Sequence, residues 1–195
     1  MQGIRSNRSV KIKRWAFLLV PCILIFLSFS NLAFTAKPSG KYRLDFFTKS
    51  NQFYLCDSAY KSNTGSNTFW TPEAYHDRLG VDYDILGISI ESYGHVKADL
   101  EILDSADPEN DFSRYDHVVE AGITVQSGLL QVLNFPDYKS YLKLIVTPGK
   151  YRVRVYSSGL NNVDPEADEG QDHYKITMWP DSRMARKVLK QFVKK

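Results

Sequence analysis

The chain has 195 residues, of which 43% are hydrophobic and 13% aromatic, so it can bury one sizeable core and is short for two domains. Its formal net charge is +3, but residues 37–181 hold 14 basic and 22 acidic residues, a balance of −8. A nucleic-acid-binding protein carries its positive charge over the binding face. This distribution therefore argues against nucleic acid as a partner.

Residues 1–36 predict a signal peptide or a membrane anchor, and thus an exported protein. A basic stretch from Arg5 to Arg14 precedes the apolar run WAFLLVPCILIFLSF, which fits a secretory signal. Cleavage would follow Ser30 or Ala36; without it, the apolar residues 15–34 reach the roughly 20 residues that span a bilayer. Once the leader is removed, Cys56 is the only cysteine, so no intramolecular disulfide forms and we expect this thiol to be buried.

Short strands and one short helix are predicted along residues 37–181. YRLDFFTK and NQFYLCD begin the series. In TPEAYHDRLG, Thr71 is the expected N-cap, Pro72 the first helical residue and Gly80 the C-terminal stop. YDILGISIES, GLLQVLNF and HYKITMW are further expected strands.

Period-2 alternation defines the best strand candidates. HVKADLEIL places Val96, Ala98, Leu100 and Ile102 on one face, and HVVEAGITV does the same with Val119, Ala121, Ile123 and Val125. In YLKLIVTPGKYRVRVYS, Pro148 and Gly149 suit a type II turn, which predicts a hairpin. Together the elements predict a mainly-β fold, an antiparallel β-sandwich with one short inserted helix.

The tail, residues 182–195, is predicted to be a basic amphipathic helix. Asp181 or Ser182 would cap it, while Met184, Val188 and Phe192 share one helical face. Such a helix either packs on the sandwich or contacts an anionic membrane surface.

The Asp-His neighbours in the sequence do not predict a catalytic site or a metal site. Adjacent residues on a strand point to opposite faces, so Asp116-His117 and Asp172-His173 are not expected to form dyads. Neither a Gly-x-Ser-x-Gly elbow nor a His-Glu-x-x-His pair occurs. The acidic run DPEADEGQD departs from an EF-hand in its glycine position and in Lys175, where the closing glutamate would stand. We therefore assign no catalytic residue, metal ligand or cofactor.

Several motifs in order resemble the ComJ family, the inhibitors of a competence DNA-entry nuclease. They are NQFYLCDS, then FWTPEAYHDRLGVDYDILGISIESYGHVKADLEIL, then VTPGKYRVRVYSSGL and DHYKITMWP. The second half also resembles a group of small bacterial proteins with DHVVEA and DHY…WP signatures. The resemblance covers most of residues 41–180 and includes no catalytic motif. It implies a β-sandwich that acts by binding a protein.

Two acidic loops are the candidate partner-binding sites. A nuclease or toxin with a positively charged cleft would meet them through complementary charge, and the alternative is that both loops are merely solvated. An export leader and a basic tail are departures from the family, so inhibition would act outside the cytoplasm or at the membrane. The candidate residues are Asp164, Glu166, Asp168, Glu169 and Asp172 in one loop and Asp104, Asp107, Glu109 and Asp111 in the other.

The leading hypothesis is thus an exported, non-enzymatic protein-binding domain, an inhibitor of a basic nuclease or toxin. The alternative is a structural or ligand-binding module of the cell envelope. That module would use calcium in the acidic loop or the aromatic residues Trp70, Tyr75, Tyr156 and Trp179. A hydrolase would need a histidine-centred cluster assembled from distant strands.

Overall fold

The computed structural model describes residues 40–164 and 169–194. The predicted signal or anchor, residues 1–36, lies outside this part of the chain, as do Glu166 and Asp168. Among the described residues, no helix combines the length and the apolar character needed to cross a membrane.

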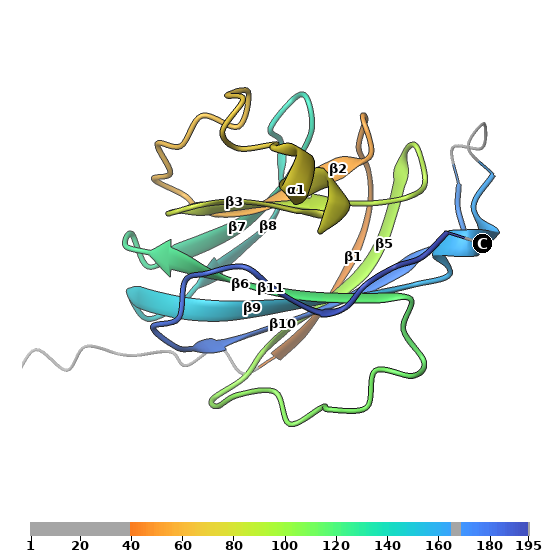
Figure 1. Cartoon of the computed structure of the whole chain (residues 1–195). Coiled ribbons are helices and arrows are strands. Elements are labelled where there is room, and N and C mark those ends of the chain that lie inside the picture. The colour runs from red at the N-terminus through yellow and green to blue at the C-terminus, as the bar shows by residue number, and fades with distance from the viewer. Residues whose placement is uncertain (1–39, 165–168, 195) are drawn as a thin grey trace, which may run out of the picture. The chain divides into compact units, whose positions relative to one another are not determined.

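Two β-sheets form two layers, which confirms the predicted mainly-β sandwich (Figure 1). Sheet A has the order β1 (Gly40–Phe47), β5 (His95–Ile102), β10 (His173–Pro180), β9 (Gly149–Ser158), β6 (His117–Val125) and β11 (Lys187–Lys190). Sheet B has the order β3 (Leu79–Asp82), β4 (Ile85–Ser89), β2 (Gln52–Asp57), β7 (Leu129–Asn134) and β8 (Ser140–Ile145). The helices are α1 (Pro72–His76) and the 3-10 turn η1 (Leu160–Asn162). The sandwich is not purely antiparallel, because β5 and β10 pair in parallel.

The main core lies between the two sheets. Alternate residues of β5 are buried from Val96 to Ile102, as the sequence pattern predicted, and β6 contributes Val119 to Val125 at the same spacing. Phe53, Leu86 and other apolar residues of sheet B complete this cluster. Burial of alternate side chains from both sheets is what holds a sandwich together.

Helix α1 begins as predicted but ends earlier. The Thr71 hydroxyl accepts a hydrogen bond from the Ala74 amide at 3.2 Å, which confirms the N-cap. The helix ends at His76, and Gly80 is not its stop but part of β3. A Cβ on Gly80 would lie 2.7 Å from the Phe69 ring, so this glycine is needed for close packing. Arg78, with φ of 57°, takes the left-handed position instead.

The predicted Pro148-Gly149 hairpin is wrong. The two flanking strands belong to different sheets, since β8 pairs with β7 whereas β9 pairs with β6 and β10. The type II turn is absent as well, because Gly149 begins β9 and does not have the positive φ that this turn needs. Burial explains the outcome: β9 is buried on both faces from Tyr151 to Ser157, so it takes a central place in sheet A, while β8 exposes alternate residues at an edge.

The predicted tail helix is also wrong in the described residues. The C-terminal strap, residues 181–194, runs extended over sheet A and adds β11 to the edge of β6. Met184, Val188 and Phe192 are four residues apart, and this spacing fits one side of a strand as well as one side of a helix. The edge of β6 decides between them, because the Gly122 amide donates to the Met184 carbonyl at 2.9 Å.

Candidate functional site

One half of the outer face of sheet A is left uncovered by the loops and by the C-terminal strap. Strands β6 and β9 are buried on both faces, since residues 103–116 and the strap contribute contacts over their outer side. Strands β1 and β5 instead alternate buried with exposed residues. Their outer side, continued by the start of β10, therefore presents charged side chains to solvent.

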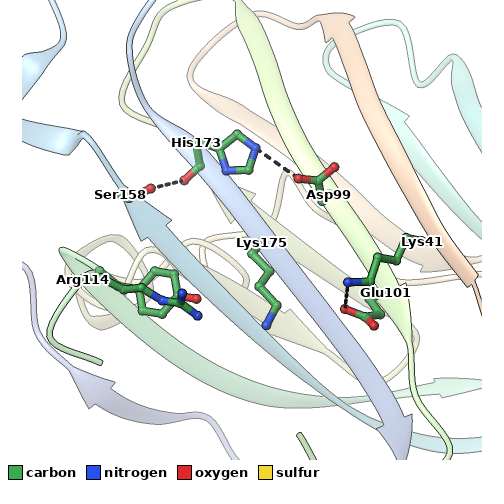
Figure 2. Close-up of a pocket in the computed structure, with 8 residues that line it drawn as sticks. Lys41, Asp99, Glu101, Arg114, Ser158, His173 and Lys175 are labelled. Atoms are coloured by element: carbon green, nitrogen blue, oxygen red, sulfur yellow. Dashed lines mark hydrogen bonds and ion pairs between the residues drawn. The ribbon is translucent and has the colours of Figure 1, made fainter. Parts of the chain in front are cut away.

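A recess of about 460 Å³ opens on this face (Figure 2). In the view of Figure 2, Lys175 of β10 lies between Arg114 and Glu101, and His173 and Asp99 lie together at one end. The lining residues are Lys41, Asp99, Glu101, Arg114, Tyr115, Ser158, His173 and Lys175.

Most charges in this recess are matched by a neighbour. His173 Nε2 lies 3.3 Å from Asp99 Oδ2, and Lys41 Nζ lies 3.5 Å from Glu101 Oε2. The Ser158 hydroxyl donates to the main-chain carbonyl of His173, not to its ring. Serine and histidine therefore do not form a nucleophile–base pair here. The recess offers a polar contact surface with charges of both signs.

A buried ionic network lies under the covered half of sheet A, and sequence reasoning missed it. Glu120 of β6 accepts from Arg152 Nε at 3.2 Å and from Arg154 Nε at 2.5 Å. Arg154 also donates to the Tyr156 hydroxyl, which donates to Asp107 Oδ2 at 2.8 Å. The alternation in YRVRVY was the available signal, because it places both arginines opposite the core face of β9.

Two of the predicted partner-binding carboxylates are buried, so their assignment to a contact surface is corrected. Burial raises the pKa of Asp107, but hydrogen bonds from the Glu109 amide and the Tyr156 hydroxyl outweigh it and leave the pKa below its usual value. Asp172 Oδ2 accepts from the Glu91 and Ser92 amides, each at 3.1 Å, and from the Tyr174 and Ser92 hydroxyls. Both carboxylates serve the fold.

The remaining predicted carboxylates within the described residues lie nearer the surface. Glu109 is half-buried and pairs with Arg114 at 2.7 Å, while Asp111 is exposed and accepts from the Ser113 amide. Asp104, Asp164 and Glu169 are exposed.

Glu169 brings one acidic loop to the exposed face of sheet A. Its Oε1 lies 3.2 Å from His95 Nδ1, and its Oε2 lies 3.8 Å from Lys97 Nζ. The other ring nitrogen of His95 lies 2.5 Å from Asp45 Oδ1. Glu169 thus lies where β1 ends and β5 begins.

The histidines do not assemble into one cluster. His117 is fully buried, and its Nε2 contacts the Asp77 carbonyl at 2.9 Å while Nδ1 accepts from the Phe192 amide. The expected separation of Asp116 from His117 is confirmed, since Asp116 accepts from the Leu160 amide instead. Among the described residues, no group of three or more His, Cys, Asp or Glu side chains could hold a metal ion.

His117 predicts a loss of stability as the pH falls. Burial lowers its pKa to about 4, against about 6.5 in an unfolded chain. Between these values the unfolded chain binds a proton that the native protein does not, so stability present above pH 6.5 is lost on the way to pH 4. The difference corresponds to about 3 kcal/mol. Urea unfolding at pH 7 and at pH 4.5 should show it, and His117→Gln should lose correspondingly less over the same range; an equal loss in both proteins would contradict this role.

Cys56 lies in the core, and the four aromatic residues of the envelope-module hypothesis lie in two separate regions. Cys56 is fully buried, and burial raises the pKa of its thiol to about 12, as expected for an unreactive cysteine. Trp70 stacks on Tyr75 of α1, with ring centroids 5.1 Å apart, whereas Tyr156 and Trp179 are buried in sheet A. The four aromatic residues therefore do not form one ligand site.

Comparison with known proteins shows the fold. No protein-family model and no curated protein matches the chain. Among solved structures it is similar to ComJ from Bacillus subtilis, described as an inhibitor of the DNA-degrading activity of NucA. The TM-score is 0.55 at 14% identity, over 73% of this chain and 98% of ComJ. The product of crocagin biosynthetic gene J aligns with a TM-score of 0.47 at 19% identity, over 74% and 99% of the two chains. The chain therefore has a ComJ-like fold.

Proposed function

We propose that the chain is an exported, non-enzymatic binding protein that inhibits a basic enzyme, a nuclease or a toxin. The observation that carries the proposal is the likeness to ComJ, an inhibitor that aligns with this chain over 98% of its own length. An inhibitor of this kind acts through a surface rather than through a catalytic constellation. Because one fold can host different functions, the surface of an inhibitor must also suit its partner.

The charge of the domain supports the proposal. Residues 37–181 carry a formal balance of −8, and the six basic residues of the tail reduce it to −2 over residues 37–195, so the acidic charge lies away from the C-terminal strap. An acidic surface attracts a partner whose own cleft is basic. Asp45 and Glu169 flank His95, with side chains 55% and 68% exposed. Asp164, five residues before Glu169 in the sequence, is also exposed. We assign the partner contact to this acidic end of β1 and β5.

Affinity capture from the envelope fraction of the source cells tests the proposal. The full chain in a mild detergent should retain a basic protein at low salt and release it at moderate salt, because salt screens contacts between exposed charges. The variant Asp45→Asn/Glu169→Gln should retain much less of it. The matched control Asp82→Asn/Asp137→Asn removes two exposed carboxylates elsewhere and should retain as much as the wild type.

Absence of any specifically retained protein at low salt would count against a binding protein. Equal losses in the two double variants would contradict the assigned surface, because they would show a general effect of net charge.

A further inference from the structure

A second recess, distinct from the one in Figure 2, lies between the C-terminal strap and sheet A. It has a volume of about 430 Å³ and shares no lining residue with the first recess. Four of its six lining residues carry a positive charge. They are Arg152, Arg183, Arg186 and Lys187, and the other two are Glu120 and Ala185.

Arg152 is the fixed, buried wall of this recess. Its side chain is only 4% exposed. Its Nε donates to Glu120, and its Nη1 donates to the main-chain carbonyls of Arg183 and Ala185, at 3.2 and 2.6 Å. The guanidinium therefore anchors the strap and is itself held in one orientation.

Two strap arginines are oriented in the same manner. Arg183 uses Nε and Nη2 on Asp181, and Arg186 uses Nε on Asp77 at 2.7 Å and Nη1 on the Leu79 carbonyl at 3.0 Å. Each guanidinium, including that of Arg152, thus engages two of its three nitrogens. Within the described residues, the third nitrogen of each has no hydrogen-bond partner. A guanidinium group that is already held in one orientation, and whose remaining N–H groups can still donate, is suited to binding an oxyanion.

The local charge also favours an anion. The recess and its immediate ion pairs contain five cations and three carboxylates, and each of these carboxylates already accepts from an arginine. Three guanidinium groups and one ammonium offer more donors than one planar carboxylate accepts, which favours the oxygens of a phosphate. The cations are Arg152, Arg154, Arg183, Arg186 and Lys187, and the carboxylates are Asp77, Glu120 and Asp181.

We propose that this recess binds a single phosphate group, either the headgroup of an anionic phospholipid or free inorganic phosphate. The acidic body disfavours a long polyanion such as nucleic acid, whereas a single phosphate responds mainly to the nearby cations. If the phosphate belongs to a lipid, the tail contacts the membrane as expected from the sequence. The contact is then made by a recess under an extended strap and not by a helix. The proposal is independent of the proposed inhibitory function, because it uses a different set of residues.

Exposed members of the recess provide variants that should fold. Arg183→Gln/Lys187→Gln removes two exposed cations, and Arg43→Gln/Lys143→Gln is the matched control on β1 and β8. The full chain is held in nanodiscs of phosphatidylcholine and titrated with inorganic phosphate at constant ionic strength. Thermal unfolding and hydrogen exchange over residues 181–194 are measured. A second arm compares these discs with discs that contain phosphatidylglycerol, without added phosphate.

We expect phosphate to raise the melting temperature and to slow exchange in the strap, with an affinity about tenfold or more weaker in Arg183→Gln/Lys187→Gln. The control pair should bind as the wild type does. Protection in phosphatidylglycerol discs would identify a lipid headgroup as a source; protection by phosphate alone would identify the free anion.

Three results would overturn the proposal. The first is no protection in either arm. The second is equal weakening in both double variants, which would indicate general charge screening. The third is tighter binding of a single-stranded oligonucleotide than of phosphate, lost in Arg183→Gln/Lys187→Gln, which would make nucleic acid the ligand.

Discussion

Replacing Glu120 with alanine is expected to lower the free energy of unfolding by about 3–5 kcal/mol, because it leaves two buried guanidinium groups without their carboxylate. The Glu120 side chain is 7% exposed, and those of Arg152 and Arg154 are 4% and 11% exposed. Removing one member of a buried ion cluster costs far more than the intact cluster contributes, since the stranded charges cannot return to water. The loss should appear as a shift of the urea midpoint at pH 7.

The exposed pair between Lys41 and Glu101 provides the control for this effect. Glu101→Ala removes a carboxylate from the same sheet, but its partner Lys41 has a side chain that is 77% exposed. An exposed ion pair contributes about 1 kcal/mol or less, so this variant should remain close to the wild type. If Glu120→Ala were as stable as Glu101→Ala, the buried network would not have the role assigned to it.

Replacing Asp172 with alanine is expected to destabilise the protein by about 3 kcal/mol and to loosen the acidic loop. The carboxylate accepts from the Ser92 amide and from the Tyr174 hydroxyl, both of which are buried and would lose this acceptor. Because Asp172 ties the loop to residues 91–92, amide exchange around Glu169 should become faster. Thermal unfolding and hydrogen exchange measure the two effects.

Glu169→Ala is the matched control, since it removes an exposed carboxylate three residues before Asp172. Its side chain is 68% exposed, and we expect a loss of about 1 kcal/mol or less. Equal stability of the two variants would mean that Asp172 does not anchor the loop.

The strands could be predicted from the sequence wherever core residues occupy every second position. The alternation around Val96 and around Val119 predicted β5 and β6, and the structure confirms both. Strand β3 was missed because only two residues separate it from the end of α1 at His76, and its four residues are too few to show a period. Which strands pair depends on contacts between distant segments, so the sequence predicted a hairpin at Pro148-Gly149, whereas in the structure Gly149 begins β9 without the positive φ of a type II turn.

The tail shows a second limit of sequence reasoning. Met184, Val188 and Phe192 have a spacing that a helix and a strand share, and the free edge of β6 selects the strand. Burial of single carboxylates is similarly invisible in the sequence. Asp172 and Glu169 belong to the same acidic run, yet one is buried beneath residues 91–92 and the other is exposed beside His95.

Inhibition of the captured basic enzyme by the full chain is the most direct test of the proposed function. The rate at which the captured enzyme degrades its substrate is measured while the chain is added at increasing molar ratio, at low and at moderate salt. NucA from Bacillus subtilis serves as a reference nuclease. The account predicts that activity falls to near zero at about one equivalent at low salt and recovers as salt rises. Undiminished activity of the captured enzyme at a large excess of the chain would contradict it.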